Sequence, residues 1–590
     1  MSSSDRTITG VLRLFLLVGF ATLASYLFNL QVVRGSYYQG IAENNYVRLV
    51  RVPPVRGEIF DRRNRPLVVN IPTTNLYITP GRIENRQLLT RFLQRHLGVS
   101  AVELEELLFE NRFNPHGDAL LFANVPFNIC VRIAENQNYY PSLSFRRENG
   151  RRNLIPAHFL GYIGGIGEEE YQRLAALDYK RNEFLGKAGL EKTYELLLRG
   201  EAGYEVRQVD ARGMSLDLLR HNLQKGPKPG LQLMLTIDLE LQNYTRELLS
   251  PYERAAAVVI DPRTGGVLAW VSQPEFDQNR FMRRISNQEW QELMDNPARP
   301  LLDRVLQGTY PPGSVFKPIT ASLGLERNVI TPDEKLASCN GGMQVGNRWF
   351  ACWNEHGHGR SALTDAIKVS CDVYFYDLSS RLDLDDWQEW TRQNGWIDET
   401  GIDLPSQRSG FFPNSDWYIE RFGRDISLRG HKVNLAIGQG EALTSPLHVC
   451  CYYAALANGG TWRTPHFFRK VIGENASSVN QAFAPEQRRL PISERTLSVL
   501  REGLWKVVNE ERGTGQVAQV EGAVVYGKTG SAENHQGELT HAWFVCWAEW
   551  NEPEIAVTVF MENAGHGGSV AAPVAKQILD YYARNMRTNP

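Results

Sequence analysis

An apolar stretch near the N-terminus constrains the fold of this chain more than any other feature. From Val11 to Val33 the sequence reads VLRLFLLVGFATLASYLFNLQVV, and about 20 predominantly apolar residues cross a bilayer as a helix. A signal peptide cleaved near Ala24 is the alternative, but the apolar run continues through Phe28. The sequence therefore favours an uncleaved, single-pass transmembrane helix.

The rest of the chain has the composition of an ordinary globular protein on one side of a membrane. Hydrophobic residues make up 42% of the sequence and charged residues 22%, which is typical of folded domains. The 64 basic and 66 acidic residues give a net charge of −2. Because no long run of either sign occurs, we expect no nucleic-acid partner. The arginines beside the apolar stretch, Arg6 and Arg13 against Arg34, do not decide its orientation.

A segment rich in proline and glycine divides the soluble part of the chain. Lys225–Gly230 reads KGPKPG and contains no apolar anchor, so it is typical of a linker. The sequence before it mixes short strand-like runs with charged helical stretches. We therefore predict four parts: a cytoplasmic tail at 1–10, a transmembrane anchor at 11–33, a mixed domain at 34–230 and a second domain at 231–590.

The second domain has strand patterns at both ends and helical patterns between them. Residues 231–249 begin as a strand and become an amphipathic helix, and 255–271 read as two strands around a Thr-Gly-Gly turn. Residues 316–465 are mainly helical, and the C-terminal part adds three strands and a helix, at 524–526, 542–548, 555–561 and 572–585. This order predicts an antiparallel sheet covered by helices, an α/β (α+β) multidomain fold.

Ser314 is the one serine of the chain with a lysine three residues later. Residues 310–313, Tyr-Pro-Pro-Gly, stop the preceding structure and lead into a helix. On a helix Ser314 and Lys317 share a face, within reach of a hydrogen bond. A serine hydroxyl becomes nucleophilic when a neighbour takes its proton, and a partly buried lysine can do so. The plainer alternative is a solvated pair on a helix surface.

Lys528-Thr529-Gly530 is the one Lys-Ser/Thr-Gly sequence, and it follows the strand pattern at 524–526. Lysine and threonine alternate across a strand, beside a glycine that lets a ligand approach the backbone. This arrangement suits the binding of a substrate carboxylate. The alternative is a strand end with an exposed lysine.

Between these two motifs the pattern Ser-x-Asn/Asp occurs three times, beginning at Ser338, Ser370 and Ser478. Ser338 lies beside two glycines in an expected loop, and Ser478 lies in a polar stretch that also reads as a surface loop. Ser370 lies between two helical segments, which can hold a hydroxyl and a carboxylate in place. We therefore prefer Ser370 and Asp372.

Ser-x-x-Lys, a Ser-x-Asn-type motif and Lys-Thr-Gly, in this order, are the motifs of penicillin-binding proteins and class A β-lactamases. The chain resembles the class B penicillin-binding proteins of cell elongation over almost its whole length. Further segments match this family, at 56–62, 189–195, 235–238, 264–265, 438–440 and 455–460. The chain departs from the common pattern at a few positions, Asp303, Val315, Asp372, Ser531 and Glu533.

The resemblance implies a mechanism for peptidoglycan D,D-transpeptidation. Ser314 attacks the carbonyl of the penultimate D-Ala of a stem peptide, and Lys317 takes its proton. Ser370 relays a proton to the departing D-Ala, with Lys528 nearby, and an amine of a second strand then resolves the acyl-enzyme. No cofactor is needed for this chemistry.

The resemblance also implies the remaining contacts of the substrate. Lys528 and Thr529 bind the terminal carboxylate, with Gly530 and Ser531 beside them. Backbone N–H groups of Ser314 and Ser531 form the oxyanion hole. Asp372 stands where asparagine is more common, so it adds a charge whose ionisation the sequence leaves open.

The resemblance further implies where the protein acts and with whom. It predicts a single-pass protein of the bacterial inner membrane, with an elongated mixed pedestal at 34–230 and a penicillin-binding-protein/β-lactamase-like catalytic domain at 231–590 in the periplasm. The expected partners are peptidoglycan stem peptides, a multi-spanning lipid II polymerase, a periplasmic scaffold protein and β-lactam antibiotics. The alternatives are a division-type transpeptidase, a D,D-carboxypeptidase, a β-lactamase and a scaffold that activates a polymerase. The pedestal and the anchor argue against a β-lactamase.

Four residues have the chemistry of a structural zinc (Zn²⁺) site, with the spacing Cys339-x12-Cys352-x5-His358-x12-Cys371. Three thiolates and one imidazole form a closed tetrahedral set. The segment at 341–353 has no periodicity and reads as a loop that needs a cross-link. The resemblance supports a metal, because some elongation-type members have a metal site at matching positions. The alternatives are His356 as fourth ligand, a Cys339–Cys352 disulfide and free thiols.

Overall fold

The computed structural model describes residues 3–38, 47–110, 118–180, 183–209, 215–282, 287–534 and 539–587, together with Arg112, Pro115 and Ile285. Met1 and Ser2 of the predicted tail lie outside this part, as do residues 39–46 and 210–214 of the predicted pedestal. Contacts along the chain define two compact units. The first comprises Met1–Arg56, Thr79–Asp118 and Arg199–Gly230, and the second Gly57–Ile78, Ala119–Leu198 and Leu231–Pro590.

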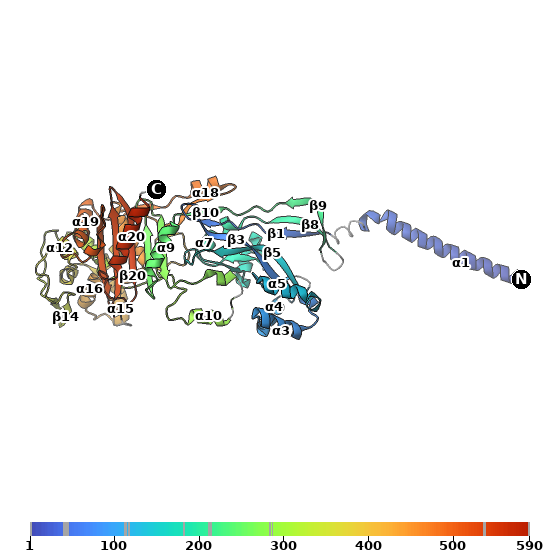
Figure 1. The fold of residues 1–590 in the computed structure, drawn as a ribbon, viewed down its shortest axis with the longest axis horizontal. Helices are drawn as coiled ribbons and strands as arrows, with labels where there is room; N and C mark the ends of the chain where they lie inside the picture. The colour runs from blue at the N-terminus through green and yellow to red at the C-terminus, as the bar shows by residue number, and fades with distance from the viewer. Residues whose placement is uncertain are drawn as a thin grey trace. The chain divides into compact units, whose positions relative to one another are not determined.

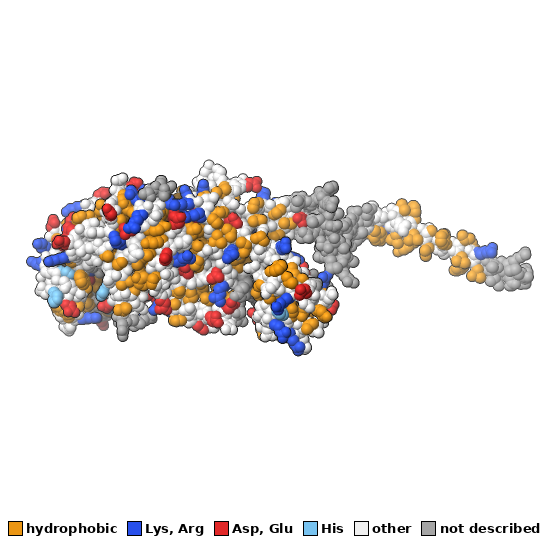
Figure 2. Space-filling model, in the orientation of Figure 1, with side chains coloured by type: hydrophobic (Ala, Val, Ile, Leu, Met, Phe, Trp, Pro, Cys, Tyr) orange, Lys and Arg blue, Asp and Glu red, His pale blue; other side chains and the backbone are white. Residues whose placement is uncertain are grey.

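The first unit contains the predicted anchor. Helix α1 (Ser3–Phe28) continues as one π-helical turn (Asn29–Val33). Within it, Gly10–Val33 has a mean hydropathy of 2.0 and none of its side chains is buried, so it is the one helix of the described residues long and apolar enough to cross a membrane. Figure 2 shows hydrophobic side chains along this helix. The unit also has a three-stranded antiparallel sheet and two helices, namely β1 (Val47–Val52), β8 (Gly203–Val209), β9 (Ser215–Lys225), α3 (Arg86–Leu97) and α4 (Ala101–Glu110).

The second unit contains a mixed sheet whose strands come from distant parts of the sequence. Short strand β2 (Ile59–Phe60) pairs in parallel with β10 (Gln232–Leu235). The buried Asp61 carboxylate stabilises this pairing because it bonds to both segments. It accepts hydrogen bonds from the backbone N–H groups of Arg63 (2.8 Å), Arg65 (2.8 Å) and Leu239 (3.1 Å). The other strands are β3 (Pro66–Ile78), β4 (Ala119–Phe122), β5 (Leu143–Asn153) and β16 (Phe468–Ile472).

The predicted antiparallel sheet forms the centre of the second unit (Figure 1). Its order is β12-β11-β20-β19-β18, with β11 at Ala255–Ile260, β12 at Val267–Gln273, β18 at Val524–Ala532, β19 at His541–Glu549 and β20 at Pro553–Met561. Strand β11 and strand β20 from Ile555 onward are buried residue after residue, because helices cover both faces. Helices α9 (Leu239–Leu249) and α20 (Ala571–Asn585) pack together on one face, and α17 (Pro446–Ala457) packs on the other.

The region at 316–465 is mainly helical, as predicted. Its further helices are α11 (Lys317–Glu326), α12 (Leu363–Lys368), α13 (Asp372–Ser379), α14 (Leu384–Gln393), α15 (Ser415–Phe422) and α16 (Leu428–Ala436). Helix α19 (Glu494–Asn509) packs against α12 and β18. The described part of this unit also has α5 (Phe127–Glu135), β6 (Ile163–Gly165), α6 (Glu168–Leu174), β7 (Phe184–Gly186), α7 (Gly189–Thr193), α8 (Glu195–Arg199), α10 (Asn287–Met294), β15 (Thr461–Arg463) and β17 (Gln487–Arg489).

Two local predictions were wrong. The segment at 341–353 is not a loop but a hairpin, β13 (Gly342–Val345) with β14 (Arg348–Ala351). Its Gly-Asn turn is a hairpin signal, and strands of four residues are too short to show a clear alternation. Ser478 lies in helix α18 (Ala476–Ala482), although it is exposed as expected of a surface position. Its polar surroundings resembled a loop because α18 has no buried face.

Candidate active site

Ser314 lies in a 3₁₀ turn, Gly313–Phe316, that leads directly into α11. The turn is held by two hydrogen bonds, from Gly313 N–H to the Gly438 carbonyl (2.8 Å) and from the buried Tyr453 hydroxyl to the Val315 carbonyl (2.9 Å). Gly313 has φ +58°, a conformation that glycine adopts without strain. Ser314 is half-buried, and within the described residues its hydroxyl makes no hydrogen bond.

Lys317 is fully buried, and its ammonium has three oxygen partners. Nζ donates to Ser370 O (2.8 Å), Ser370 Oγ (3.1 Å) and Asp372 Oδ1 (2.7 Å). The predicted hydrogen bond between Lys317 and Ser314 is not among those of the described residues. In a 3₁₀ turn, side chains three residues apart lie one above the other, so the two groups share a face as predicted. The buried carboxylate draws the ammonium toward residue 372.

The Ser370 hydroxyl joins the two lysines of the candidate site. Ser370 lies between α12 and α13 with φ +54°, a left-handed conformation that costs a non-glycine residue about 1–3 kcal/mol. Its Oγ lies 3.1 Å from Lys317 Nζ and 2.9 Å from Lys528 Nζ. Because both lysines can donate to this oxygen, the hydroxyl proton of Ser370 is free to point to a third group.

Burial changes the protonation of this cluster. Lys528 is fully buried in β18, and desolvation together with the Lys317 charge lowers its pKa well below the usual value. Two lysines around one hydroxyl repel each other when both are charged, which favours a neutral amine at one of them. Burial raises the pKa of the Asp372 carboxyl, and the neighbouring Lys317 ammonium acts against that rise.

The predicted carboxylate-binding residues form one stretch of the edge strand β18. The prediction had placed the strand only up to residue 526, but it continues to Ala532. A Cβ added at Gly530 would lie 3.1 Å from the Pro312 carbonyl, so β18 lies directly against the turn that carries Ser314. Thr529 Oγ1 and Ser531 Oγ lie along the same strand.

Sequence reasoning missed three residues beside this strand. Thr514 Oγ1 shares a 2.7 Å hydrogen bond with Thr529 Oγ1. Gly567 N–H donates to Ser531 Oγ (3.3 Å), and His566 Nδ1 lies 3.4 Å from the same hydroxyl. The sequence His-Gly-Gly at 566–568, after β20, could have indicated His566 and Gly567. Glycines let another segment of backbone approach closely. Gly567 confirms this, since a Cβ there would lie 2.3 Å from the Gly530 carbonyl.

The four predicted metal ligands converge beside the catalytic cluster. The ligand atoms of Cys339, Cys352, His358 and Cys371 all lie within 4.8 Å of one another. His358 Nδ1 lies 3.6 Å from Cys339 Sγ and 3.5 Å from Cys352 Sγ. Tetrahedral zinc, with bonds of about 2.3 Å to sulfur and 2.0 Å to nitrogen, places such ligands about 3.6 Å apart. The residues therefore fit the ion.

The alternatives for this cluster are less well matched by the structure. His356 is exposed and does not belong to the group. None of the seven cysteines forms a disulfide, so Cys339 and Cys352 are not joined to each other. The hydrogen bonds that Cys371 and His358 make with Cys352 lower the pKa of its thiol, whereas burial raises the pKa of the Cys339 thiol and the bond to Cys352 raises that of Cys371.

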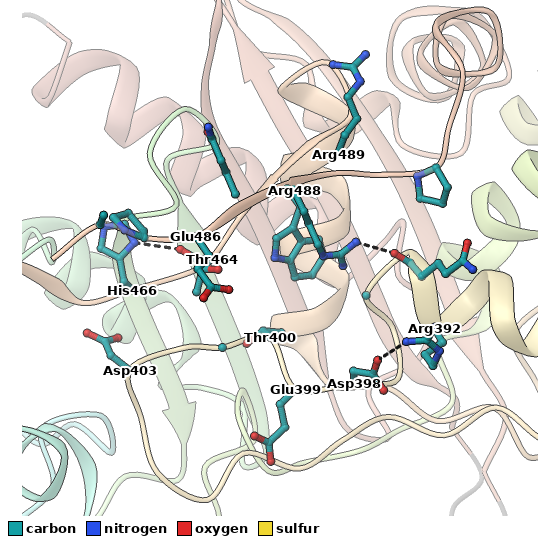
Figure 3. A pocket seen from close by; sticks show the side chains of 18 of the residues that line it. Arg392, Asp398, Glu399, Thr400, Asp403, Thr464, His466, Glu486, Arg488 and Arg489 are labelled. Atoms are coloured by element: carbon teal, nitrogen blue, oxygen red, sulfur yellow. Dashed lines mark hydrogen bonds and ion pairs between the residues drawn. The ribbon is translucent and has the colours of Figure 1, made fainter. Parts of the chain in front are cut away.

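A separate pocket of about 760 Å³ lies at the C-terminal end of α14 and beside β15 and β17. Figure 3 shows Arg392 and Asp398 pointing toward each other, whereas Arg489 and Glu399 point away from them. Arg392 pairs with Asp398 (3.1 Å), and Arg488 lies over the Trp462 ring at 4.8 Å. None of the predicted site residues lines this pocket, so the cluster around Ser370 remains the candidate active site.

Comparison with known proteins gives the same assignment. A family model described as the penicillin binding protein transpeptidase domain matches residues 255–580, and one described as the penicillin-binding protein dimerisation domain matches residues 51–235. The peptidoglycan D,D-transpeptidase MrdA of Haemophilus influenzae is 33% identical over 603 residues, which cover 98% of this chain and 91% of that protein.

Similar solved structures support the same family assignment. The penicillin-binding protein 2 chain in a complex with MreC from Helicobacter pylori superposes with a TM-score of 0.77 at 27% identity, covering 91% of this chain and 99% of that one. A chain from a peptidoglycan synthase complex, described as coordinating polymerization and crosslinking, gives a TM-score of 0.70 at 27% identity and covers 97% and 98%.

The chain therefore belongs to the penicillin-binding proteins, with a dimerisation domain followed by a serine-type transpeptidase domain. Within this family it shares nearly its whole length with the D,D-transpeptidases called MrdA or penicillin-binding protein 2. The fold class and the family predicted from the motifs are confirmed.

Proposed function

We propose that this chain is a peptidoglycan D,D-transpeptidase of cell elongation, and that Ser314 is its acylated nucleophile. The observation that carries the proposal is the Ser370 hydroxyl, which lies within hydrogen-bond distance of both Lys317 and Lys528. This arrangement gives a path for a proton between the nucleophile side and the leaving-group side of the site. The elongation role follows from the similarity to MrdA proteins.

Acylation uses the hydroxyl of Ser314, which makes no hydrogen bond to any residue that the structure describes. Its Oγ attacks the carbonyl carbon of the penultimate D-Ala, and the hydroxyl proton passes to Lys317, which has first given a proton through Ser370 Oγ to the neutral amine of Lys528. The Lys317 ammonium then donates toward Ser370 Oγ, and the Ser370 proton goes to the nitrogen of the departing D-Ala as the peptide bond breaks. Such positioned proton transfers contribute about 10²- to 10⁴-fold to rate.

The edge strand β18 positions the substrate for this attack. Lys528 and Thr529 bind the terminal carboxylate, and the backbone N–H groups of Ser314 and Ser531 polarise the carbonyl oxygen that becomes negative in the transition state. The leaving D-Ala departs with its carboxylate. The amine of a second stem peptide then attacks the ester carbonyl, gives up a proton to the same lysine and serine relay, and regenerates Ser314.

A transfer assay separates this function from that of a D,D-carboxypeptidase. The purified chain is incubated with a stem pentapeptide and a fluorescent D-amino acid as acceptor amine. We expect more exchanged fluorescent peptide than hydrolysed tetrapeptide, and neither product with Ser314→Ala. Hydrolysis without exchange at high acceptor concentration would identify a carboxypeptidase instead.

We also propose that Cys339, Cys352, His358 and Cys371 hold a structural zinc ion. The ion would fix the loop at residue 371, which lies between Ser370 and Asp372, and would supply no step of the reaction. Elemental analysis tests this. We expect one zinc per chain in the wild-type protein, no zinc in Cys352→Ser, and slower acylation of that variant. Metal-free wild-type protein with full activity would overturn the proposal.

The anchor and the first unit support a proposal about location and partners. We place α1 in the bacterial inner membrane and the chain after Val33 in the periplasm, and we assign the part of the first unit outside the membrane to protein contacts. Helix α4 exposes Val102 and Phe109, each 65% accessible, which are apolar positions suited to a protein partner. The complex of the Helicobacter pylori relative with MreC supports a scaffold partner, and the peptidoglycan synthase complex supports a lipid II polymerase.

Phe109→Asp tests the role of the first unit. We expect this variant to label normally with penicillin but to bind less scaffold protein and to activate the polymerase less. Arg95→Asp on α3 is a charge-changing control outside the α4 apolar surface. If Phe109→Asp binds the scaffold protein and activates the polymerase as well as the wild type does, α4 is not part of the interface.

A further inference from the structure

Trp353 connects the metal cluster with the catalytic cluster. It directly follows Cys352 in the chain. Its backbone N–H donates to Asp372 Oδ2 (3.0 Å), so the carboxylate that binds Lys317 through one oxygen binds Trp353 through the other. Its indole Nε1–H lies 3.1 Å from the carbonyl oxygens of both Val369 and Ser370. The orientation of the ring is therefore fixed from two sides.

The ring of Trp353 is exposed in spite of these anchors. The residue is 60% accessible to solvent, and its one aromatic neighbour among the described residues is His358, whose ring is tilted at 50° with the centroids 5.4 Å apart. A large apolar face gains free energy when a ligand covers it, and a fixed ring loses little conformational entropy on binding. An exposed, oriented indole beside a catalytic serine therefore has the properties of a substrate-binding surface.

The position of the ring relative to Ser370 indicates which part of a substrate it meets. Lys528 contacts Ser370 at its hydroxyl and Trp353 contacts it at its carbonyl, while Lys317 donates to both oxygens. In the proposed mechanism the carboxylate end of the substrate lies along Thr529. The acyl side of the scissile bond extends the other way, past Ser370, and so toward the indole.

We propose that the indole face of Trp353 binds the apolar group on the acyl side of the donor. In a stem peptide this group is the methylene chain of the residue before the acylated D-Ala, and in a penicillin it is the side chain on the β-lactam ring. Trp353 thereby favours donors that have an apolar acyl substituent. This inference rests on Ser314 being the acylated residue.

The test compares acylation by two penicillins that differ only on the acyl side. Benzylpenicillin has a phenylacetyl group, and 6-aminopenicillanic acid has none. Second-order acylation rates are measured for the wild type and for Trp353→Ala, Trp353→Phe and the control Trp349→Ala. Trp349 is also exposed, at 55%, but lies over Gly342, where an added Cβ would meet its ring at 2.5 Å.

We expect Trp353→Ala to lower the rate with benzylpenicillin about tenfold, the effect of one aromatic contact of about 1.4 kcal/mol, and the rate with 6-aminopenicillanic acid twofold or less. Trp353→Phe keeps an apolar face and should retain most of the preference, and Trp349→Ala should leave it unchanged. Equal losses with both penicillins would show that Trp353 acts only by positioning Ser370, which would overturn the inference. Labelling of Ser314→Ala would instead disprove the nucleophile.

Discussion

Lys528 Nζ lies 2.9 Å from the Ser370 hydroxyl, although the two residues are 158 positions apart in the chain. The sheet brings them together, because β18 is its edge strand and lies against the turn before α11. Lys317 reaches the same oxygen from α11. One hydroxyl thus joins the three motifs on which the family assignment rests.

Removing that hydroxyl should interrupt the proton path without removing the nucleophile. We expect Ser370→Ala to lower the second-order rate of penicillin acylation by about 10²- to 10⁴-fold, while the Lys317 bond to the residue 370 carbonyl remains. Ser380→Ala is a control, because Ser380 Oγ binds only the Asp377 carbonyl at the exposed end of α13. A Ser370→Ala rate within threefold of wild type would exclude the relay.

Gly313 should be intolerant of a side chain. A Cβ there would lie 2.9 Å from the Ser531 carbonyl, and φ is +58°. We expect Gly313→Ala to displace the turn and slow acylation about 10²-fold. Gly459→Ala is the matched control, with φ +62° and no atom within 4 Å of the added Cβ. It should lower stability by about 1 kcal/mol through backbone strain alone and leave acylation unchanged; equal acylation rates in the two variants would contradict the contact.

The Tyr453 hydroxyl should stabilise the turn that carries Ser314. Tyr453→Phe leaves the buried Val315 carbonyl without that 2.9 Å bond, at a cost of about 1–3 kcal/mol. The control is Tyr374→Phe, because the buried Tyr374 hydroxyl has no hydrogen-bond partner in the described residues. Chemical unfolding followed by fluorescence measures both. A Tyr374→Phe loss as large as that of Tyr453→Phe would refute the assigned role.

His448 should make stability depend on pH. Burial lowers its pKa from 6.5 to about 4, so between these values the unfolded chain binds a proton that the folded chain does not. Stability therefore falls as pH drops from 6.5 to 4, by up to about 3 kcal/mol. We expect His448→Gln to flatten this part of the profile of unfolding free energy against pH, and the exposed His356→Gln not to. Parallel profiles for wild type and His448→Gln would contradict this.

The candidate catalytic residues Lys317, Ser370 and Lys528, which the structure brings together, could be selected from the sequence because each belongs to a short motif with a fixed order. Ser314, Lys317 and Lys528 could be found from spacing alone, and Ser370 was separated from Ser338 and Ser478 by its position between two helical patterns. The four candidate metal ligands were also selected by residue type, because three thiols and an imidazole are rare together. Their convergence within 4.8 Å could not be read from spacings of 12 and 5 residues.

Contacts across the edge of the sheet could not be predicted from the sequence. Thr514 contacts Thr529, and His566 contacts Ser531. These contacts depend on the tertiary fold, and no periodic pattern in the sequence predicts them. The same holds for the strand pairing of residue 59 with residue 233, which joins a segment of the predicted pedestal to a segment of the predicted catalytic domain within the second unit. The hairpin at 342–351 was missed for a local reason, since its strands have four residues each.

Mass spectrometry of the protein after exposure to benzylpenicillin tests the central claim most directly. The account predicts one covalent adduct per chain, with the mass of the intact penicillin, located on the peptide that contains Ser314 and absent from Ser314→Ala. Ser322→Ala, a buried serine of α11 bonded to the Ile319 carbonyl, should still form the adduct. An adduct on any other residue, or an undiminished adduct in Ser314→Ala, would contradict the account.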